Sequence, residues 1–188
     1  MLIALLATAS ADDAPVFDTD VSAGVLAGTV LGEWPVPGLG LGWQGRYDAF
    51  VGSDEPGARV GLSIFAAGSA LLLQDREEVL ADGSVETEAF DWVHYGALAL
   101  IRYDPQAPWG GTFGLGFSRF DLDDYYEGPH AVPMLTMEGG ARRALGKQKR
   151  FFLDLGVRTC WGQDRSALEP EWTDWWTVWG SAALGAHL

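Results

Sequence analysis

The sequence predicts an all-β fold, an eight-stranded antiparallel up-and-down transmembrane β-barrel. Three observations support it: apolar residues recur at every second position, short and long connections alternate, and aromatic residues gather near both ends of the alternating stretches. The 188 residues suffice for one well-buried domain, and the nine tryptophans, nine phenylalanines and 25 glycines favour strands. After the first residues, no apolar stretch reaches the ~18 residues that a spanning helix needs.

The N-terminal residues have the features of a secretory signal peptide. Leu2–Ala9 form a short apolar core, and Ala9-Ser10-Ala11 is a cleavage site of the A-x-A type. No Lys or Arg precedes the apolar run, so either the α-amino group supplies the charge or the true start lies upstream. A buried N-terminal strand is the alternative. We expect a cleaved signal over 1–11, a short lead over 12–20 and the barrel domain over 21–188.

Eight candidate strands follow along the chain. Their approximate ranges are 21–32, 38–51, 59–73, 90–103, 111–122, 131–145, 150–162 and 175–188. The first, third and fifth are apolar on both faces, so their facing is not determined by pattern. The second sets Trp43 against Arg46 and Asp48. The fourth sets a row of apolar residues against a row that contains His94 and Arg102. Period two therefore describes these segments better than period 3.6.

The connections and their charges indicate two unlike ends. Those after the second, fourth and sixth strands are short, whereas those after the third and seventh are long. Residues 75–90, 119–130 and 163–176 carry −5, −3 and −3, which is −11 of the net −14. Five of the twelve basic residues surround one short turn: Arg142, Arg143, Lys147, Lys149 and Arg150. Solvation alone explains charged loops but not this one-sided distribution, so we expect the acidic end outside and both termini in the periplasm.

Aromatic residues are expected to form two girdles. Tyr103, Trp109, Phe113 and Phe151 fall at the predicted periplasmic edge. The other edge would carry Trp161, Trp176, Tyr125 and Tyr126. A bilayer favours two aromatic girdles that flank an aliphatic band.

The export signal, eight strands of about ten residues, alternating loop lengths and aromatic edges resemble the small outer-membrane barrels of the OmpA/OmpX kind. The resemblance covers roughly residues 20–188 and is architectural. It implies a location in a Gram-negative outer membrane. It also implies an interior filled by side chains, because eight strands enclose just enough space for them. An open diffusion pore is therefore not the first expectation.

The stretch RRALGKQKRFFLDLGVR, residues 142–158, predicts specific interior contacts. A three-residue turn at 147–149 makes the numbers of opposed residues add up to 296. This register pairs Arg142 with Asp154 and Glu138 with Arg158, which are opposite charges on the inward face. Charges in a narrow lumen must be paired, so we interpret them as a polar plug. An ion-pair gate or a catalytic role is the alternative.

An enzyme alternative, a lipid A-modifying hydrolase or acyltransferase, would need a nucleophile, a base and an orienting acid. His94, on the inward row beside Trp92, is the best candidate base. Deacylase-like barrels place a Ser two residues after the His, but position 96 is Gly. His130 begins the sixth strand and is a second candidate, whereas His187 lies near the periplasmic end. The favoured interpretation is structural histidines in hydrogen bonds.

The sequence predicts no cofactor and no metal site, since it has no phosphate-cradling Gly loop, zinc cluster or nucleotide fingerprint. Its acidity argues against nucleic acid as a partner. The expected partners are outer-membrane lipids and lipopolysaccharide, with an extracellular ligand at the acidic loops. The favoured role is a structural or surface-interaction barrel without catalysis. A narrow channel is another alternative in the membrane, and a ligand-holding barrel of the lipocalin type is the alternative outside it.

Overall fold

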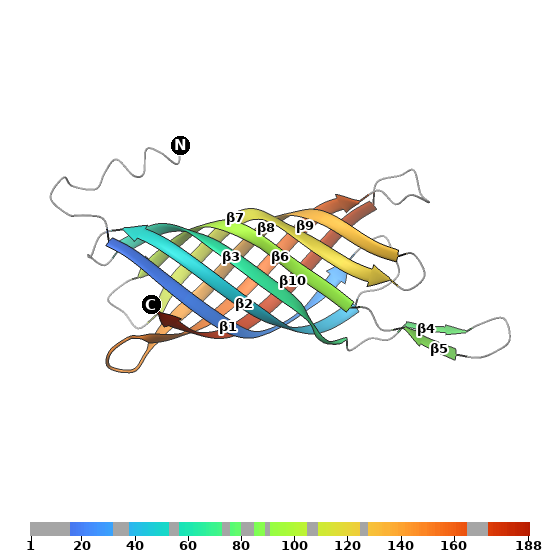
Figure 1. The fold of residues 1–188 in the computed structure, drawn as a ribbon, viewed down its shortest axis with the longest axis horizontal. Coiled ribbons are helices and arrows are strands. Elements are labelled where there is room, and N and C mark those ends of the chain that lie inside the picture. Colours follow the sequence, from blue (N-terminus) through green and yellow to red (C-terminus); the bar gives the residue numbers. More distant parts are fainter. Residues whose placement is uncertain are drawn as a thin grey trace.

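Eight long strands close into one antiparallel barrel (Figure 1). They are β1 (Val16–Leu31), β2 (Gly38–Gly52), β3 (Gly57–Leu72), β6 (Asp91–Asp104), β7 (Trp109–Asp124), β8 (Gly128–Leu145), β9 (Phe151–Asp164) and β10 (Thr173–His187). Each barrel strand pairs with the barrel strands before and after it in sequence, and β1 closes the barrel against β10. The predicted eight-stranded antiparallel barrel is confirmed.

The structure is a computed structural model. It describes residues 16–31, 38–52, 57–72, 76–79, 85–88, 91–104, 109–124, 128–164 and 173–188. The predicted signal peptide over 1–11 and the predicted girdle residues Tyr125 and Tyr126 lie outside these residues. Within them, no helix is long and apolar enough to cross a membrane.

The first strand begins at Val16 and so extends into the segment expected as a lead. Its first residues already alternate, because Phe17 faces outward while Asp18 and Asp20 form ion pairs inside. Both acids fall in the segment that was expected to precede the barrel. Their inward direction is set by pairing with β2, which runs from Val16 opposite Gly52 to Val30 opposite Gly38.

The segment between β3 and β6 contains a small hairpin where the sequence predicted only a loop. The hairpin consists of β4 (Arg76–Val79) and β5 (Val85–Glu88), paired from Arg76 opposite Glu88 to Val79 opposite Val85. It projects beyond the end of the barrel (Figure 1). Asp82-Gly83, a favoured sequence for tight turns, lies between the two strands in the chain. The prediction missed this signal because charge dominates the segment.

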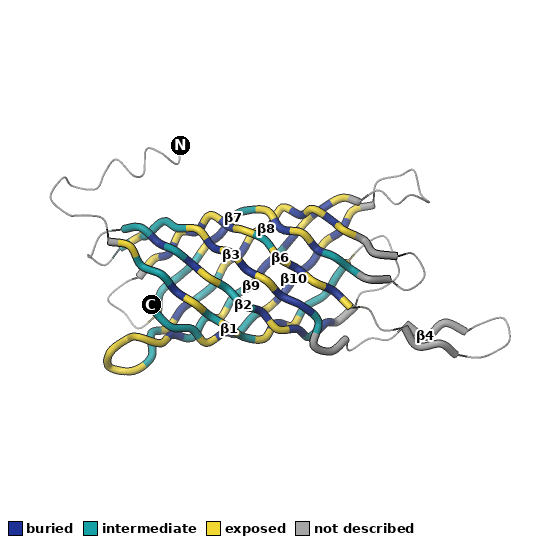
Figure 2. Tube along the Cα trace, viewed as in Figure 1, coloured by how far each residue is buried: buried dark blue, intermediate teal, exposed yellow. Residues whose placement is uncertain are grey.

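Burial alternates along the barrel strands, as bands of buried and exposed residues show in Figure 2. The outward row of large apolar side chains includes Leu62, Ile64, Leu115, Phe117 and Leu184, all exposed. The inward row holds both apolar and charged side chains with almost no exposed surface. Such an arrangement is the reverse of a water-facing barrel and fits a wall in contact with hydrocarbon.

Aromatic residues lie on the outer wall near both ends of the strands. Near the short turns, the exposed aromatics are Phe17, Tyr103, Trp109, Phe113 and Phe151. Near the opposite end, Trp161 and Trp176 are directly paired across β9 and β10, with ring centroids 6.2 Å apart. The described girdle residues therefore occupy the two edges at which a bilayer interface would be expected.

The β8–β9 hairpin has the predicted register. Arg142 lies opposite Asp154 and Glu138 lies opposite Arg158. The ladder ends with Leu145 opposite Phe151, so the turn covers more residues than the three that were expected. Gly146 has φ 73°, a backbone conformation that costs other residues energy, and Lys149 N–H donates to the Gly146 carbonyl at 3.4 Å.

Candidate functional site

Aromatic side chains fill the interior at the end with the long connections. Trp179 is 2% exposed, and its indole lies 4.6 Å from that of Trp92, which also stacks on Phe120 at 6.0 Å. The buried cluster around them contains Leu26, Ala67, Trp92, Phe120, Val132, Met134, Cys160, Trp175 and Trp179. We call this set the aromatic plug.

Glycines make room for the aromatic plug. A Cβ atom on Gly42 would lie 2.7 Å from the Trp92 ring, and one on Gly28 would lie 2.5 Å from the Trp179 ring. Both distances are shorter than real Cβ contacts, so the indoles occupy the space that side chains at these positions would need. Gly42 on β2 and Gly28 on β1 are therefore explained by packing inside the barrel.

Charged side chains fill the other half of the interior. Among the described residues, the ion pairs inside the barrel join five arginines to five carboxylates: Arg46, Arg59, Arg102, Arg142 and Arg158 with Asp18, Asp20, Asp48, Glu138 and Asp154. We call this set the ion-pair network. Its formal charges cancel, which is how a low-dielectric interior tolerates them.

The two pairs anticipated from the hairpin belong to this network. Arg142 donates to both carboxylate oxygens of Asp154 at 2.7 Å, a bidentate geometry that is favourable for guanidinium and carboxylate. Arg158 donates to Oε2 of Glu138 through Nε at 2.9 Å, and its Nη2 lies 2.7 Å from the same oxygen. The structure thus places all four predicted residues inside and brings them together in pairs.

Further members were not identified from the sequence. Asp20 accepts hydrogen bonds from Arg102 at 2.6 Å and from Arg142, and Nδ1 of His187 contacts its other oxygen. Asp18 accepts from Arg102 at 2.8 Å and from Arg59 at 2.7 Å. The sequence pattern left the facing of β1 and β3 open, and only closure of the barrel brings β1 near β3, β6 and β8.

Contacts across the lumen connect the two predicted pairs. Arg46 on β2 donates to Glu138 and, at 2.6 Å, to Asp48. Asp48 lies 3.5 Å from Arg142, which completes the connection to the second pair. Three guanidinium groups also lie over phenylalanine rings: Arg102 over Phe50 at 4.1 Å, Arg142 over Phe152 at 3.8 Å and Arg158 over Phe65 at 3.7 Å. These cation–π contacts fill space between the charges.

His94 lies between the aromatic plug and the ion-pair network. Its Nε2 is 2.8 Å from the Ser118 hydroxyl, which in turn contacts Thr136 at 2.6 Å. Cys160 Sγ lies 3.8 Å from the same nitrogen. The serine thus comes from the neighbouring strand and not from position 96. His94 is 1% exposed and Ser118 8%, so an acyl substrate has no surface on which to reach this pair.

The other two histidines lie apart from His94. His130 belongs to the start of β8, where its backbone pairs with Leu122. His187 lies near the end of β10 beside Asp18 and Asp20, and their ligand atoms fall within 4.8 Å of one another. That spacing would suit a cation, but the arginines already bound to both carboxylates supply the compensating charge. These contacts favour an ion-pair role for this group.

Fold and interior together define a closed β-barrel with an outward apolar wall. No family profile matches the chain, and no curated protein matches its sequence. Among solved structures, the fold is similar to that of Neisserial surface protein A, with a TM-score of 0.56 and 16% identity over 89% of this chain and 96% of that chain.

Two further solved structures have similar folds. For the attachment invasion locus protein Ail of Yersinia pestis, solved with the heparin analogue sucrose octasulfate, the TM-score is 0.54 with 13% identity over 92% of this chain and 99% of that chain. For the outer membrane protein OprG from Pseudomonas aeruginosa, the TM-score is 0.51 with 11% identity over 94% of this chain and 98% of that chain. The chain therefore has the fold of eight-stranded outer-membrane barrels.

Proposed function

We propose that this protein is an integral barrel of a Gram-negative outer membrane with a structural or surface-interaction role and a closed interior. The observation that carries the proposal is the filling of the lumen by the aromatic plug and the ion-pair network. The outward apolar row and the aromatic edges support a position in the bilayer. The fold shared with NspA, Ail and OprG supports the same location.

The proposed orientation has the acidic end outside and both termini in the periplasm. The C-terminus and the basic β8–β9 turn lie at one end of the barrel, and the β4–β5 hairpin projects from the other (Figure 1). Segments 75–90, 119–130 and 163–176 hold −11 of the net charge of −14. A cationic partner fits this end better than a polyanion, because like charges repel the latter. The sulfated ligand of Ail is therefore not proposed for this chain.

Membrane insertion is tested by fractionation of expressing cells. We expect the protein in the outer-membrane fraction, released by detergent and not by high salt. The folded barrel should also migrate differently from the boiled chain in a gel, since closed barrels resist dodecyl sulfate. Recovery in the soluble fraction without detergent would contradict the membrane assignment and favour the lipocalin-type alternative.

The closed lumen is tested by conductance in planar bilayers. We expect no stable single-channel steps from the wild-type protein, because buried side chains block both halves of the barrel. A known porin reconstituted in the same bilayer serves as the positive control. Reproducible steps would favour the narrow channel. Altered acyl chains of lipid A in expressing cells, detected by mass spectrometry, would favour the enzyme.

A further inference from the structure

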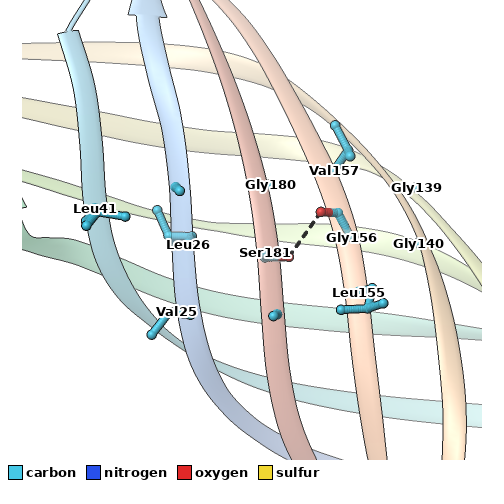
Figure 3. Close-up of a pocket in the computed structure, with 12 residues that line it drawn as sticks. Val25, Leu26, Leu41, Gly139, Gly140, Leu155, Gly156, Val157, Gly180 and Ser181 are labelled. Atoms are coloured by element: carbon cyan, nitrogen blue, oxygen red, sulfur yellow. Dashed lines mark hydrogen bonds between the residues drawn. The ribbon is translucent and has the colours of Figure 1, made fainter.

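Two apolar hollows follow one another on the outer wall along the seam between β1 and β10. The first, about 400 Å³, is lined near the basic turn by Val21, Ala23, Phe151, Leu184 and Ala186. The second, about 590 Å³, lies farther along the same strands and reaches β2, β9 and β8 (Figure 3). Ala23 pairs with Leu184, and Ala27 with Gly180, so the hollows follow one another along the same pair of strands. We call them together the seam groove.

Packing within the protein does not require Gly139 and Gly180, the two exposed glycines of the seam groove. A Cβ atom on Gly139 would meet nothing within 4 Å, and one on Gly180 would meet only a carbonyl oxygen at 3.7 Å. The interior glycines behave differently, because a Cβ on Gly42 would clash with Trp92. Between Leu155 and Val157 on one side and Val25 on the other, the small residues leave a depression in the outer wall (Figure 3).

One end of the seam groove meets the basic turn. Phe151 lines the groove and follows Arg150, whose carbonyl accepts a 2.9 Å hydrogen bond from the His187 N–H. This bond holds the turn against the last residues of β10. Lys147, Lys149 and Arg150 are exposed there.

The two acids of the β8–β9 hairpin nearest the turn do not offset these cations, because they face inward. Glu138 and Asp154 are both bound to arginines of the ion-pair network. Arg143 adds another exposed cation on the outer wall, 5.5 Å from the Trp109 ring. An aromatic beside a cation is typical of the membrane interface, where lysine and arginine reach lipid phosphates.

We propose that the seam groove and the basic turn form a binding site for an anionic glycerophospholipid. One acyl chain lies in the seam groove, and the phosphate is held by Lys147, Lys149 and Arg150 through charge-assisted hydrogen bonds. Charge complementarity selects this occupant over a second copy of the chain, whose own basic turn would be repelled. The inference rests on the proposed membrane location.

The test is lipid retention measured by native mass spectrometry after reconstitution with equal amounts of phosphatidylglycerol and phosphatidylcholine. We expect the wild type to retain phosphatidylglycerol preferentially. In the variant Lys147→Gln/Lys149→Gln/Arg150→Gln, the ratio of retained phosphatidylglycerol to phosphatidylcholine should fall about tenfold, since each cation near the surface adds to the attraction. The matched control is Arg76→Gln/Arg119→Gln/Arg165→Gln, which removes one cation from each of the acidic segments 75–90, 119–130 and 163–176 and should keep the preference.

A second variant tests the seam groove. Gly180→Leu places a side chain in open space, so the barrel should still fold and show its heat-dependent gel shift, while phosphatidylglycerol retention falls at least threefold. Equal retention of both lipids by a folded wild-type barrel would overturn the inference, as would unchanged retention in either the turn or the groove variant. Preference for lipid A over phosphatidylglycerol would also overturn it. Failure of the proposed function is distinguishable, because the wild type would then not insert at all.

Discussion

Asp20→Asn is expected to lower the free energy of unfolding by about 3–5 kcal/mol, the typical cost of breaking a buried ion pair from one side. Asp20 is 1% exposed and accepts hydrogen bonds from both Arg102 and Arg142. An amide of the same shape removes the negative charge and leaves two buried guanidinium groups short of compensation. Urea unfolding of the protein in lipid vesicles, followed by tryptophan fluorescence, measures the loss.

Two further variants isolate the reason for this loss. Asp154→Asn removes a carboxylate that is bound, within the described part of the chain, only to Arg142 and has 21% of its side chain exposed, so water screens the change and the loss should be about 1 kcal/mol. Asp20→Asn combined with Arg102→Met should recover part of the stability, because one of the two buried cations that lose the Asp20 carboxylate is removed as well. If both single variants lost equal stability, burial of Asp20 within the network would not be the cause.

Local features of the fold could be predicted because the two faces of each strand meet different surroundings. In β9, Phe151 and Leu155 face outward while Arg158 faces inward, so the alternation marks the strand and its facing at once. The charges then determine register. A shift by one residue would place Glu138 and Arg158 on opposite faces of the sheet, and a shift by two would separate them along the strands. This is why the β8–β9 register could be derived from sequence.

Contacts between distant strands could not be derived in this way. Arg46 lies 92 residues from Glu138, and Arg142 lies 122 residues from Asp20. Their meeting depends on how far each strand is staggered around the closed barrel, which no single hairpin determines. The serine that faces His94 was missed for a related reason, because it comes from β7 and not from the same strand. The sequence therefore predicts the ion pairs within one hairpin but not the contacts that distant strands make across the lumen.

Trp179→Ala is expected to lower the free energy of unfolding by about 3–5 kcal/mol, within the range for truncating large buried side chains. The cavity should not collapse, since Gly28 and Gly40 beside the ring have no side chains to fill it. The ring contact with Trp92 adds to the loss, and this part depends on both side chains. The double variant with Trp92→Ala should therefore lose less than the sum of the single losses. Urea titrations of all three variants in vesicles measure this coupling.

Trp176→Ala is the matched control for Trp179→Ala, because Trp176 lies on the same strand but faces outward with 49% of its surface exposed. Its removal leaves no interior cavity and costs one contact with Trp161 at the wall. We expect a loss of about 1 kcal/mol, in the range of an aromatic pair. Comparable losses for the two variants would mean that the interface, and not the aromatic plug, determines the stability of this end. A large loss for Trp179→Ala and a small one for Trp176→Ala would instead show that the aromatic plug determines the stability of this end.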